Sequence, residues 1–253
     1  MTKSEIHNLT TAHGTHIAWV GGEKPNAPTI VFFAGHGSDM DGTKALTAHE
    51  WADAHGVGII RFDYFGHGKS SGDMMEGNLS IWREDCLAVI DQLTTEKLIL
   101  VGSSLGGWLM LLAARARPAR IAGMIGIAAA PDFTDDLIWD ELTTAQQQAM
   151  ERDGKIALPN PYAPEDVIYP YQLILDGRKN FVLRDRQSAP YPVRLLHGTD
   201  DEEVPAATAE KLAENLEGDD VKVTLVEGAG HRFSEPAQLE LLRDSLAEIL
   251  AKI

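Results

Sequence analysis

The pattern G-x-S-x-G at residues 102–106 places Ser104 between a β-rich apolar run, KLILV, and a stretch with helical spacing. A strand, a sharp glycine turn and a helix in this order are typical of a nucleophile elbow, which projects the serine hydroxyl above a sheet. The N–H groups that begin the helix favour negative charge at that point. A glycine-rich turn without chemistry is the alternative, and the flanking strand and helix favour a nucleophile.

A serine hydroxyl needs a base within hydrogen-bond reach and a third group that orients the base. In the elbow architecture these partners follow the serine in the order acid, then histidine. The run VRLLH is followed by HGTDDEEVP, which contains Asp200 and Asp201, and the run VKVTLV is followed by a glycine-rich loop that ends in His231. The order predicts Ser104 as nucleophile, His231 as base and one of the two aspartates as the acid.

Other polar residues near these motifs fit the pattern less well. Asp63, in RFDYFGHGKS, precedes the serine and therefore stands in the wrong order for the acid. His197 lies at the end of an apolar run, and we expect a structural role for it. Glu202 and Glu203 are expected to belong to a solvated acidic turn.

Short apolar runs alternate with segments of helical spacing along most of the chain. Parallel neighbours need crossover connections, so this alternation predicts an α/β fold with a mostly parallel sheet and helices on both faces. We expect one domain over residues 1–253. The expected strands are 15–20, 29–34, 57–62, 97–101, 120–128, 193–197 and 221–226, and the expected helices are 43–55, 79–93, 104–116, 206–216 and 236–253.

The alternation is interrupted between residues 131 and 190, which we predict to form a small helical lid inserted into the domain. This stretch contains two acidic or Gln-rich helical segments and a cluster of prolines. Its aromatic residues either line an acyl pocket or cover the underside of the lid, and they are Phe133, Trp139, Tyr162, Tyr169 and Tyr171.

Composition excludes several classes of protein. The 22 Lys and Arg residues and 38 Asp and Glu residues give a net charge of −16, which disfavours nucleic acid and anionic lipid as partners. The most apolar stretch, residues 119–130, is shorter than the ~20 residues of a membrane span, so we expect no membrane span.

The single cysteine, Cys86, is expected in the core. The first residues have neither a secretory nor a transit-peptide pattern, which predicts a cytoplasmic location.

The motifs together resemble the α/β-hydrolase superfamily, and the resemblance covers nearly the whole chain. It is carried by Ser104 in GSSLGG, Asp201 in HGTDDEEVP and His231 in GAGH, which are similar to the triad of that superfamily. The segments DGTKA (41–45), RFDYFGHGKSSG (61–72), GSSLGGWLM (102–110) and RLLHG (194–198) resemble the branch that contains a mitochondrial acyl-protein thioesterase and acyl-glucuronide esterase. This alignment selects Asp201 over Asp200, two neighbours that physical reasoning does not separate.

An oxyanion hole requires two backbone donors, one of which belongs to the residue after the nucleophile, here Leu105. The second lies in the loop AGHGS, where the resemblance implies the amide of His36, with Gly37 or Ser38 as alternatives. The resemblance implies hydrolysis of a small carboxylic ester or acyl thioester through an acyl-enzyme, with no cofactor. No histidine spacing suggests a metal site. The alternatives are hydrolysis of a carbon–carbon or peptide bond on the same fold, and a non-catalytic binding module.

Overall fold

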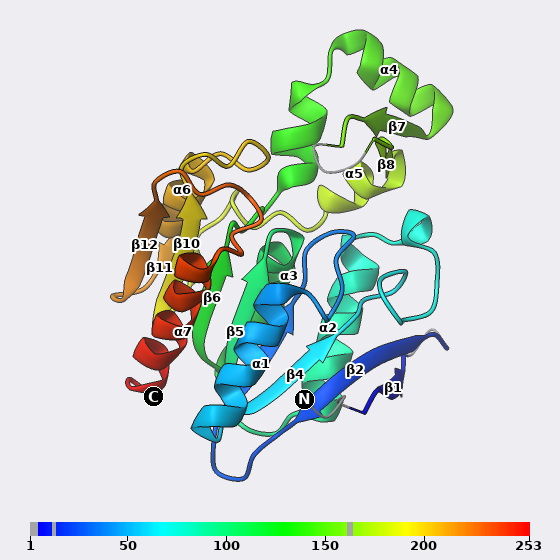
Figure 1. The fold of residues 1–253 in the computed structure, drawn as a ribbon. Coiled ribbons are helices and arrows are strands. Elements are labelled where there is room, and N and C mark those ends of the chain that lie inside the picture. The colour runs from blue at the N-terminus through cyan, green and yellow to red at the C-terminus, as the bar shows by residue number, and fades with distance from the viewer. Residues whose placement is uncertain (1–4, 12–13, 161–163) are drawn as a thin grey trace.

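An eight-stranded sheet runs through the molecule in the computed structural model, which describes residues 5–11, 14–160 and 164–253 (Figure 1). In the order of the sheet, the strands are β1 (His7–Thr10), β2 (His16–Gly22), β4 (Gly58–Phe62), β3 (Thr29–Phe33), β5 (Leu98–Ser103), β6 (Ile121–Ile127), β10 (Val193–Gly198) and β12 (Val221–Val226).

The six strands from β4 to β12 in this order are parallel to one another, and β1 and β2 add an antiparallel edge. The predicted α/β fold with a mostly parallel sheet is therefore confirmed. The strand β1, which has four residues, was not predicted from the sequence. The C-terminal ends of parallel strands all lie on the same side of a sheet. The loops after β3, β5, β10 and β12 therefore come together on that side.

Helices cover both faces of the sheet (Figure 1). On one face α1 (Thr43–His55) and α7 (Pro236–Leu250) pack together in one apolar cluster. On the other face α2 (Leu79–Leu93), α3 (Leu105–Ala116) and α6 (Ala207–Asn215) contribute to a larger cluster. Two of these helices have clear end signals: the Asn78 side chain accepts from the Ile81 N–H at the start of α2, and Gly56 ends α1 with a φ of 68°.

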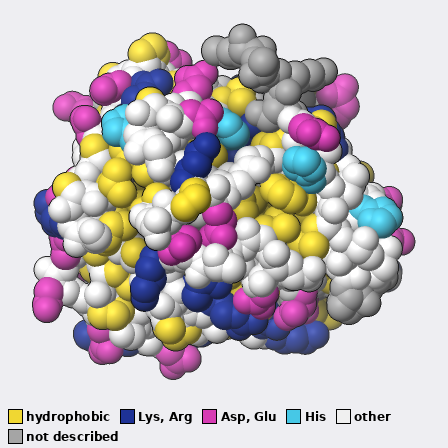
Figure 2. Space-filling view, turned by 90° about the horizontal axis from the view of Figure 1, so that it is seen from below, with side chains coloured by type: hydrophobic (Ala, Val, Ile, Leu, Met, Phe, Trp, Pro, Cys, Tyr) yellow, Lys and Arg dark blue, Asp and Glu magenta, His cyan; other side chains and the backbone are white. Residues whose placement is uncertain are grey.

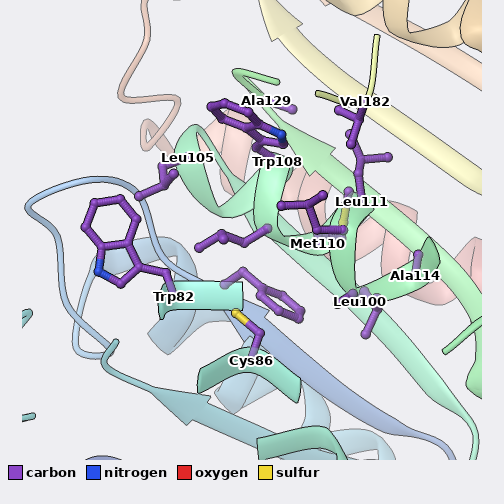
Figure 3. Packing of buried hydrophobic residues seen from close by; sticks show 14 of the residues in the cluster. Trp82, Cys86, Leu100, Leu105, Trp108, Met110, Leu111, Ala114, Ala129 and Val182 are labelled. Atoms are coloured by element: carbon purple, nitrogen blue, oxygen red, sulfur yellow. The ribbon is translucent and has the colours of Figure 1, made fainter. Parts of the chain in front are cut away.

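The larger cluster encloses the helix that follows Ser104. In α3, every residue from Leu105 to Ala114 is buried, and Trp108 and Trp82 are among the largest fully buried side chains. Figure 3 shows Trp108, Met110 and Leu111 on α3 with Cys86 nearby on α2. Burial raises the pKa of the Cys86 thiol well above its usual range, which fits the core position expected for this residue. The nucleophile elbow therefore rests on a rigid, close-packed base.

Between β6 and β10 the chain leaves the sheet and forms a separate layer, drawn in green at the top of Figure 1. A π-helical turn (Thr134–Ile138) and a 3₁₀ turn (Trp139–Glu141) lead into α4 (Thr144–Asp153), the hairpin of β7 (Lys155–Leu158) and β8 (Val167–Pro170), and α5 (Tyr171–Gly177). The hairpin was not predicted, because its strands have only four residues each and prolines lie close to their ends. Further short elements are Met74–Glu76, Pro118–Arg120, and the pair of β9 (Gln187–Ser188) with β11 (Leu216–Glu217).

The surface opposite this layer carries both acidic and basic side chains, scattered among hydrophobic ones (Figure 2). Within the described residues, no helix has the length and apolar character that crossing a membrane requires.

The close approach of α3 to β3 leads to a test of stability. An added Cβ at Gly106 would lie 2.0 Å from the Phe33 carbonyl oxygen, so Gly106→Ala should lower the free energy of unfolding by about 3 kcal/mol. At Gly22 an added Cβ meets no atom within 4 Å, so Gly22→Ala should change it by less than about 1 kcal/mol. Urea unfolding of both variants measures the difference, and equal losses would contradict this packing.

Candidate active site

Ser104 lies at the turn between β5 and α3, at the N-cap position of the helix. Its backbone has φ 53° and ψ −121°, a strained conformation for a residue with a side chain. The turn is fixed from both sides, because the Ser104 N–H donates to the Ile127 carbonyl (3.0 Å) and its carbonyl accepts from the Ala130 N–H (3.1 Å). The sequence pattern thus has the strand, strained turn and helix that an elbow requires.

His231 and Asp201 come from the loops after two neighbouring parallel strands, β12 and β10. The imidazole Nε2 of His231 lies 3.0 Å from the Ser104 Oγ, and its Nδ1 lies 2.8 Å from an Oδ2 of Asp201. The structure therefore brings together three side chains that are 97 and 30 residues apart in the sequence. This is the geometry of a nucleophile, a base and an acid that orients the base.

The two loops are tied to each other by their backbones. The Asp200 N–H donates to the Ala229 carbonyl (3.0 Å), and the Gly228 N–H donates to the Thr199 hydroxyl (2.9 Å). At Gly198 an added Cβ would lie 2.0 Å from the Ala229 oxygen, so a side chain there would separate the loops. These contacts hold the loop after β12, which contains His231 (the histidine loop), against the loop after β10, which contains Asp201 (the acid loop).

The two neighbouring aspartates have different surroundings. The Asp201 carboxylate is fully buried and accepts backbone N–H groups from Glu203 and Val204 in addition to His231. Burial alone would raise the pKa of Asp201, but hydrogen bonds from His197 and His231 hold it well below its usual range, so the carboxylate is ionised. Asp200 is exposed, and its carboxylate accepts from the hydroxyl of Thr199. Of the two, only Asp201 contacts the imidazole.

His197 contacts the same carboxylate, although its position suggested only a structural role. Its Nε2 lies 3.2 Å from Asp201 Oδ2 and 2.8 Å from the Val204 carbonyl oxygen. A signal was present in the sequence: a histidine that ends a strand, with an aspartate four residues later in the turn. Glu203 is exposed, as expected, and its carboxylate lies 3.9 Å from the Nε2 of His231.

The residues of the predicted oxyanion donors, Leu105 and His36, line the cleft together with Ser104. Leu105 is the first residue of α3, a position whose N–H has no acceptor within the helix. Gly35 is a neighbour of Ser104, since an added Cβ at Gly35 would be in van der Waals contact with the Ser104 Cβ at 3.5 Å, and His36 follows Gly35 in the wall of the cleft. Of the alternatives to His36, the Ser38 N–H donates to the Gly35 carbonyl (3.1 Å) and is thus engaged in a turn.

Asp63 stabilises the loop after β3, which contains His36. Its buried carboxylate accepts the Met40 N–H at 2.6 Å and the Lys69 N–H at 2.8 Å, which joins the loop after β3 to the loop after β4. Burial raises the pKa of Asp63 and these hydrogen bonds oppose the rise. Lys44, from the DGTKA segment, similarly joins the start of α1 to the histidine loop by donating to the Arg232 carbonyl. Asp63 and Lys44 therefore stabilise the loops that contain the candidate site residues.

The His36 imidazole is surrounded by aromatic rings. It stacks on Tyr169 of β8 with ring centroids 5.8 Å apart, and it meets His67 and Trp82 edge-on at 5.9 Å. Burial, with a smaller contribution from His67, lowers the pKa of His36 to about 4, so the ring is neutral at pH 7. The layer between β6 and β10 thus contacts the loop that contains a predicted oxyanion donor.

A cleft of about 1060 Å³ opens above Ser104 between the sheet edge and this layer. Of the aromatic residues expected in the lid, Phe133 and Tyr169 line the cleft, whereas Trp139 and Tyr171 stack on each other with centroids 5.5 Å apart. Tyr162 lies outside the described residues. One part of the wall is apolar, formed by Met74, Met75, Phe133, Leu137, Ile138, Leu158, Val167 and Ile168.

The polar part of the cleft wall carries charges of both signs, on Asp39, Lys44, Glu165, Asp166, Glu202, Glu203 and Arg232. In the part of the chain that the structure describes, no three His, Cys, Asp or Glu side chains are grouped in a way that could hold a metal ion.

Comparison with known proteins connects this geometry to named relatives. Residues 30–240 match the model of the alpha/beta hydrolase family. A human protein named palmitoyl-protein thioesterase ABHD10, mitochondrial, is 38% identical over 231 residues, which cover 91% of this chain and 75% of the relative. A bovine protein of the same name is 37% identical over 233 residues.

Two solved structures are similar over nearly their full length. A putative hydrolase from Agrobacterium vitis S4 has a TM-score of 0.94 and 38% identity, covering 98% of this chain and 99% of the other. The alpha/beta hydrolase domain-containing protein 10 from mouse has a TM-score of 0.91 and 34% identity, with the same coverage.

The prediction of a cytoplasmic location was wrong. The human and bovine relatives, and a third from Pongo abelii, are named as mitochondrial proteins, which points to a different compartment. The prediction depended on the pattern of the first residues, and a targeting segment is a removable address that takes no part in the fold.

Proposed function

The chain belongs to the alpha/beta hydrolase family, and on that premise we propose that it cleaves carboxylic esters or acyl thioesters through an acyl-enzyme formed on Ser104. The observation that carries the proposal is the hydrogen-bonded line at the base of the cleft, 3.0 Å from Ser104 to His231 and 2.8 Å from His231 to Asp201. The three residues have the order, burial and contacts that nucleophilic catalysis by serine requires.

In the acylation step the Ser104 Oγ attacks the carbonyl carbon while the Nε2 of His231 accepts the hydroxyl proton. The ionised Asp201 keeps the other imidazole proton on Nδ1 and stabilises the imidazolium that forms. The backbone amides of Leu105 and His36 donate to the oxyanion of the tetrahedral intermediate, with Gly37 as the alternative to His36. When the intermediate collapses, His231 returns the proton to the leaving alcohol or thiol.

Deacylation reverses these roles with water as the nucleophile. His231 accepts a proton from the water, which attacks the acyl carbonyl, and then returns that proton to the Ser104 Oγ. The product is a carboxylic acid and the enzyme is regenerated. None of these steps needs a metal ion or an organic cofactor.

The segment 131–190 acts in this proposal as a lid of the single domain 1–253. Its apolar side chains on the cleft wall, such as Phe133 and Ile138, would receive the acyl group. The name of the human relative, a palmitoyl-protein thioesterase, supports an acyl thioester as one substrate. The charged side chains that also line the cleft would contact the leaving group.

A panel of substrates tests the proposal. Matched p-nitrophenyl esters, acyl thioesters and aminoacyl amides of one acyl group should give turnover of the ester and thioester, and a fluorophosphonate probe should label Ser104. Turnover of the amide alone would favour a peptide hydrolase. Neither turnover nor labelling, in a sample shown to be folded, would favour a binding module. The Ser104→Ala variant is the control for labelling at any other serine.

A further inference from the structure

His197 is a buried titratable group that the proposed steps do not use. It occupies the end of β10 with an exposed fraction of 1%, and its Nε2 has two oxygen atoms within reach. The Val204 carbonyl oxygen lies at 2.8 Å, and an Asp201 carboxylate oxygen lies at 3.2 Å. A buried histidine with a structural role alone would need only the first of these contacts.

The carbonyl contact fixes the tautomer of this imidazole. A carbonyl oxygen only accepts hydrogen bonds, so the Nε2 of His197 must carry the proton and donate it. The same Nε2 lies 3.2 Å from the Oδ2 of Asp201, so its proton lies near that carboxylate oxygen as well. The Oδ2 of Asp201 thus lies between two imidazoles, 2.8 Å from the Nδ1 of His231 and 3.2 Å from the Nε2 of His197.

The remaining contacts show how Asp201 is held. Its Oδ1 accepts from the Glu203 N–H at 3.0 Å and the Val204 N–H at 2.9 Å, so the backbone of its own turn holds that oxygen. The other oxygen, Oδ2, faces His231 and lies 3.2 Å from the Nε2 of His197 at the end of β10. The charged and titratable groups around the pair are His197 from β10, His231 from the loop after β12, and Glu203, whose carboxylate lies 3.9 Å from the Nε2 of His231.

We propose that His197 is a positioning residue for the reaction: its Nε2–H holds the Oδ2 of Asp201 in line with the Nδ1 of His231. The inference rests on the proposed function, because it requires Asp201 to act through His231. Removal of a residue that orients a functional side chain through a hydrogen bond commonly lowers activity by about 10- to 100-fold. The expected effect acts on kcat, since His197 does not line the cleft.

Two substitutions separate the donor from the volume of the ring. His197→Leu removes the N–H and should lower kcat for a p-nitrophenyl ester by about 10- to 100-fold with little change in KM. His197→Gln places an amide N–H near the position of Nε2 and should recover most of kcat. Without the His197 donor, Asp201 is held less well in line with His231 and stabilises its imidazolium less, so the acid limb of the pH–rate profile should move to lower pH in the leucine variant only. Equal losses in both variants, without a shift of the acid limb, would overturn the proposal.

A double-mutant cycle with Asp201→Asn tests whether His197 acts through Asp201. In the Asp201→Asn background, His197→Leu should change the residual kcat by less than about 3-fold, because the acid that it positions is absent. The same loss in both backgrounds would mean a general structural role and would overturn the inference. An inactive wild-type enzyme, or an Asp201→Asn variant as active as the wild type, would instead overturn the proposed function.

A measurement on the wild-type chain covers the case in which the leucine variant does not fold. ¹⁵N–¹H spectra of the histidine rings should show the proton of His197 on Nε2. Labelling of Ser104 with a fluorophosphonate changes the hydrogen bonding next to His231, and the Nε2–H signal of His197 should then shift through the shared carboxylate. If the signals of His231 shift and those of His197 do not, the proposed coupling is wrong.

Discussion

Replacement of Ser104 by alanine is expected to lower kcat/KM for a p-nitrophenyl ester by about 10⁴-fold or more. The variant lacks the oxygen that attacks the carbonyl, and the imidazole 3.0 Å away has no hydroxyl proton to accept. The remaining activity would come from the oxyanion donors and from binding of the substrate, which leave a small acceleration over water. Steady-state kinetics at high enzyme concentration measures this residual rate.

The residues of a triad act as a unit, which provides a second readout of the same prediction. His231→Ala should cost about as much as Ser104→Ala, and the double variant should be hardly slower than either single one. Ser245→Ala, the same chemical change on α7, is a control away from the cleft and should leave kcat/KM within about 3-fold of the wild type. Multiplicative losses from Ser104 and His231 would contradict a shared step.

Asp201→Asn is expected to lower kcat by about 10⁴-fold, whereas Asp200→Asn should change it by less than about 3-fold. The two side chains are neighbours in the sequence and differ in what they contact. The buried carboxylate of Asp201 accepts from the Nδ1 of His231 at 2.8 Å, and its low pKa keeps it ionised at pH 7. An asparagine cannot stabilise an imidazolium, and its amide favours the wrong tautomer of the histidine.

Asp200→Asn is a matched control, because it makes the same chemical change one residue away on an exposed side chain whose carboxylate contacts Thr199. Thermal unfolding of both variants would show whether either loses stability. The opposite order of activities would assign the acid to Asp200.

Much of this arrangement could be predicted from the sequence, because alternating apolar runs and helical segments determine a parallel sheet. In such a sheet, the loops that follow the strands meet at one edge, so Ser104, His231 and the two aspartates were expected close together. The choice of Asp201 over Asp200 came from resemblance alone. The choice between the two aspartates depends on which side chain points into the protein from the loop. Backbone contacts determine this, such as the hydrogen bond from the Val204 N–H to Asp201.

The features that the sequence did not predict depend on contacts between distant segments. The short strand β1 and the hairpin of β7 and β8 have few residues and little periodicity, so their formation depends on neighbours in the fold. The stack of Tyr169 on His36 joins residues 133 positions apart, and no local pattern indicates it. His197 and Asp201 are only four residues apart in the sequence. Their contact was not predicted, because a histidine at the end of an apolar strand was expected to be structural.

The most direct measurement of the central claim is to trap the acyl-enzyme. Wild-type protein is mixed with an acyl thioester or p-nitrophenyl ester, quenched in acid within the first turnovers and digested for mass spectrometry. We predict one acyl group per chain, on the peptide that contains Ser104, together with a burst of the leaving group and no acylation of the Ser104→Ala variant. Rapid turnover with no acylated Ser104 peptide, or acylation of another residue that supports the same rate, would contradict the mechanism.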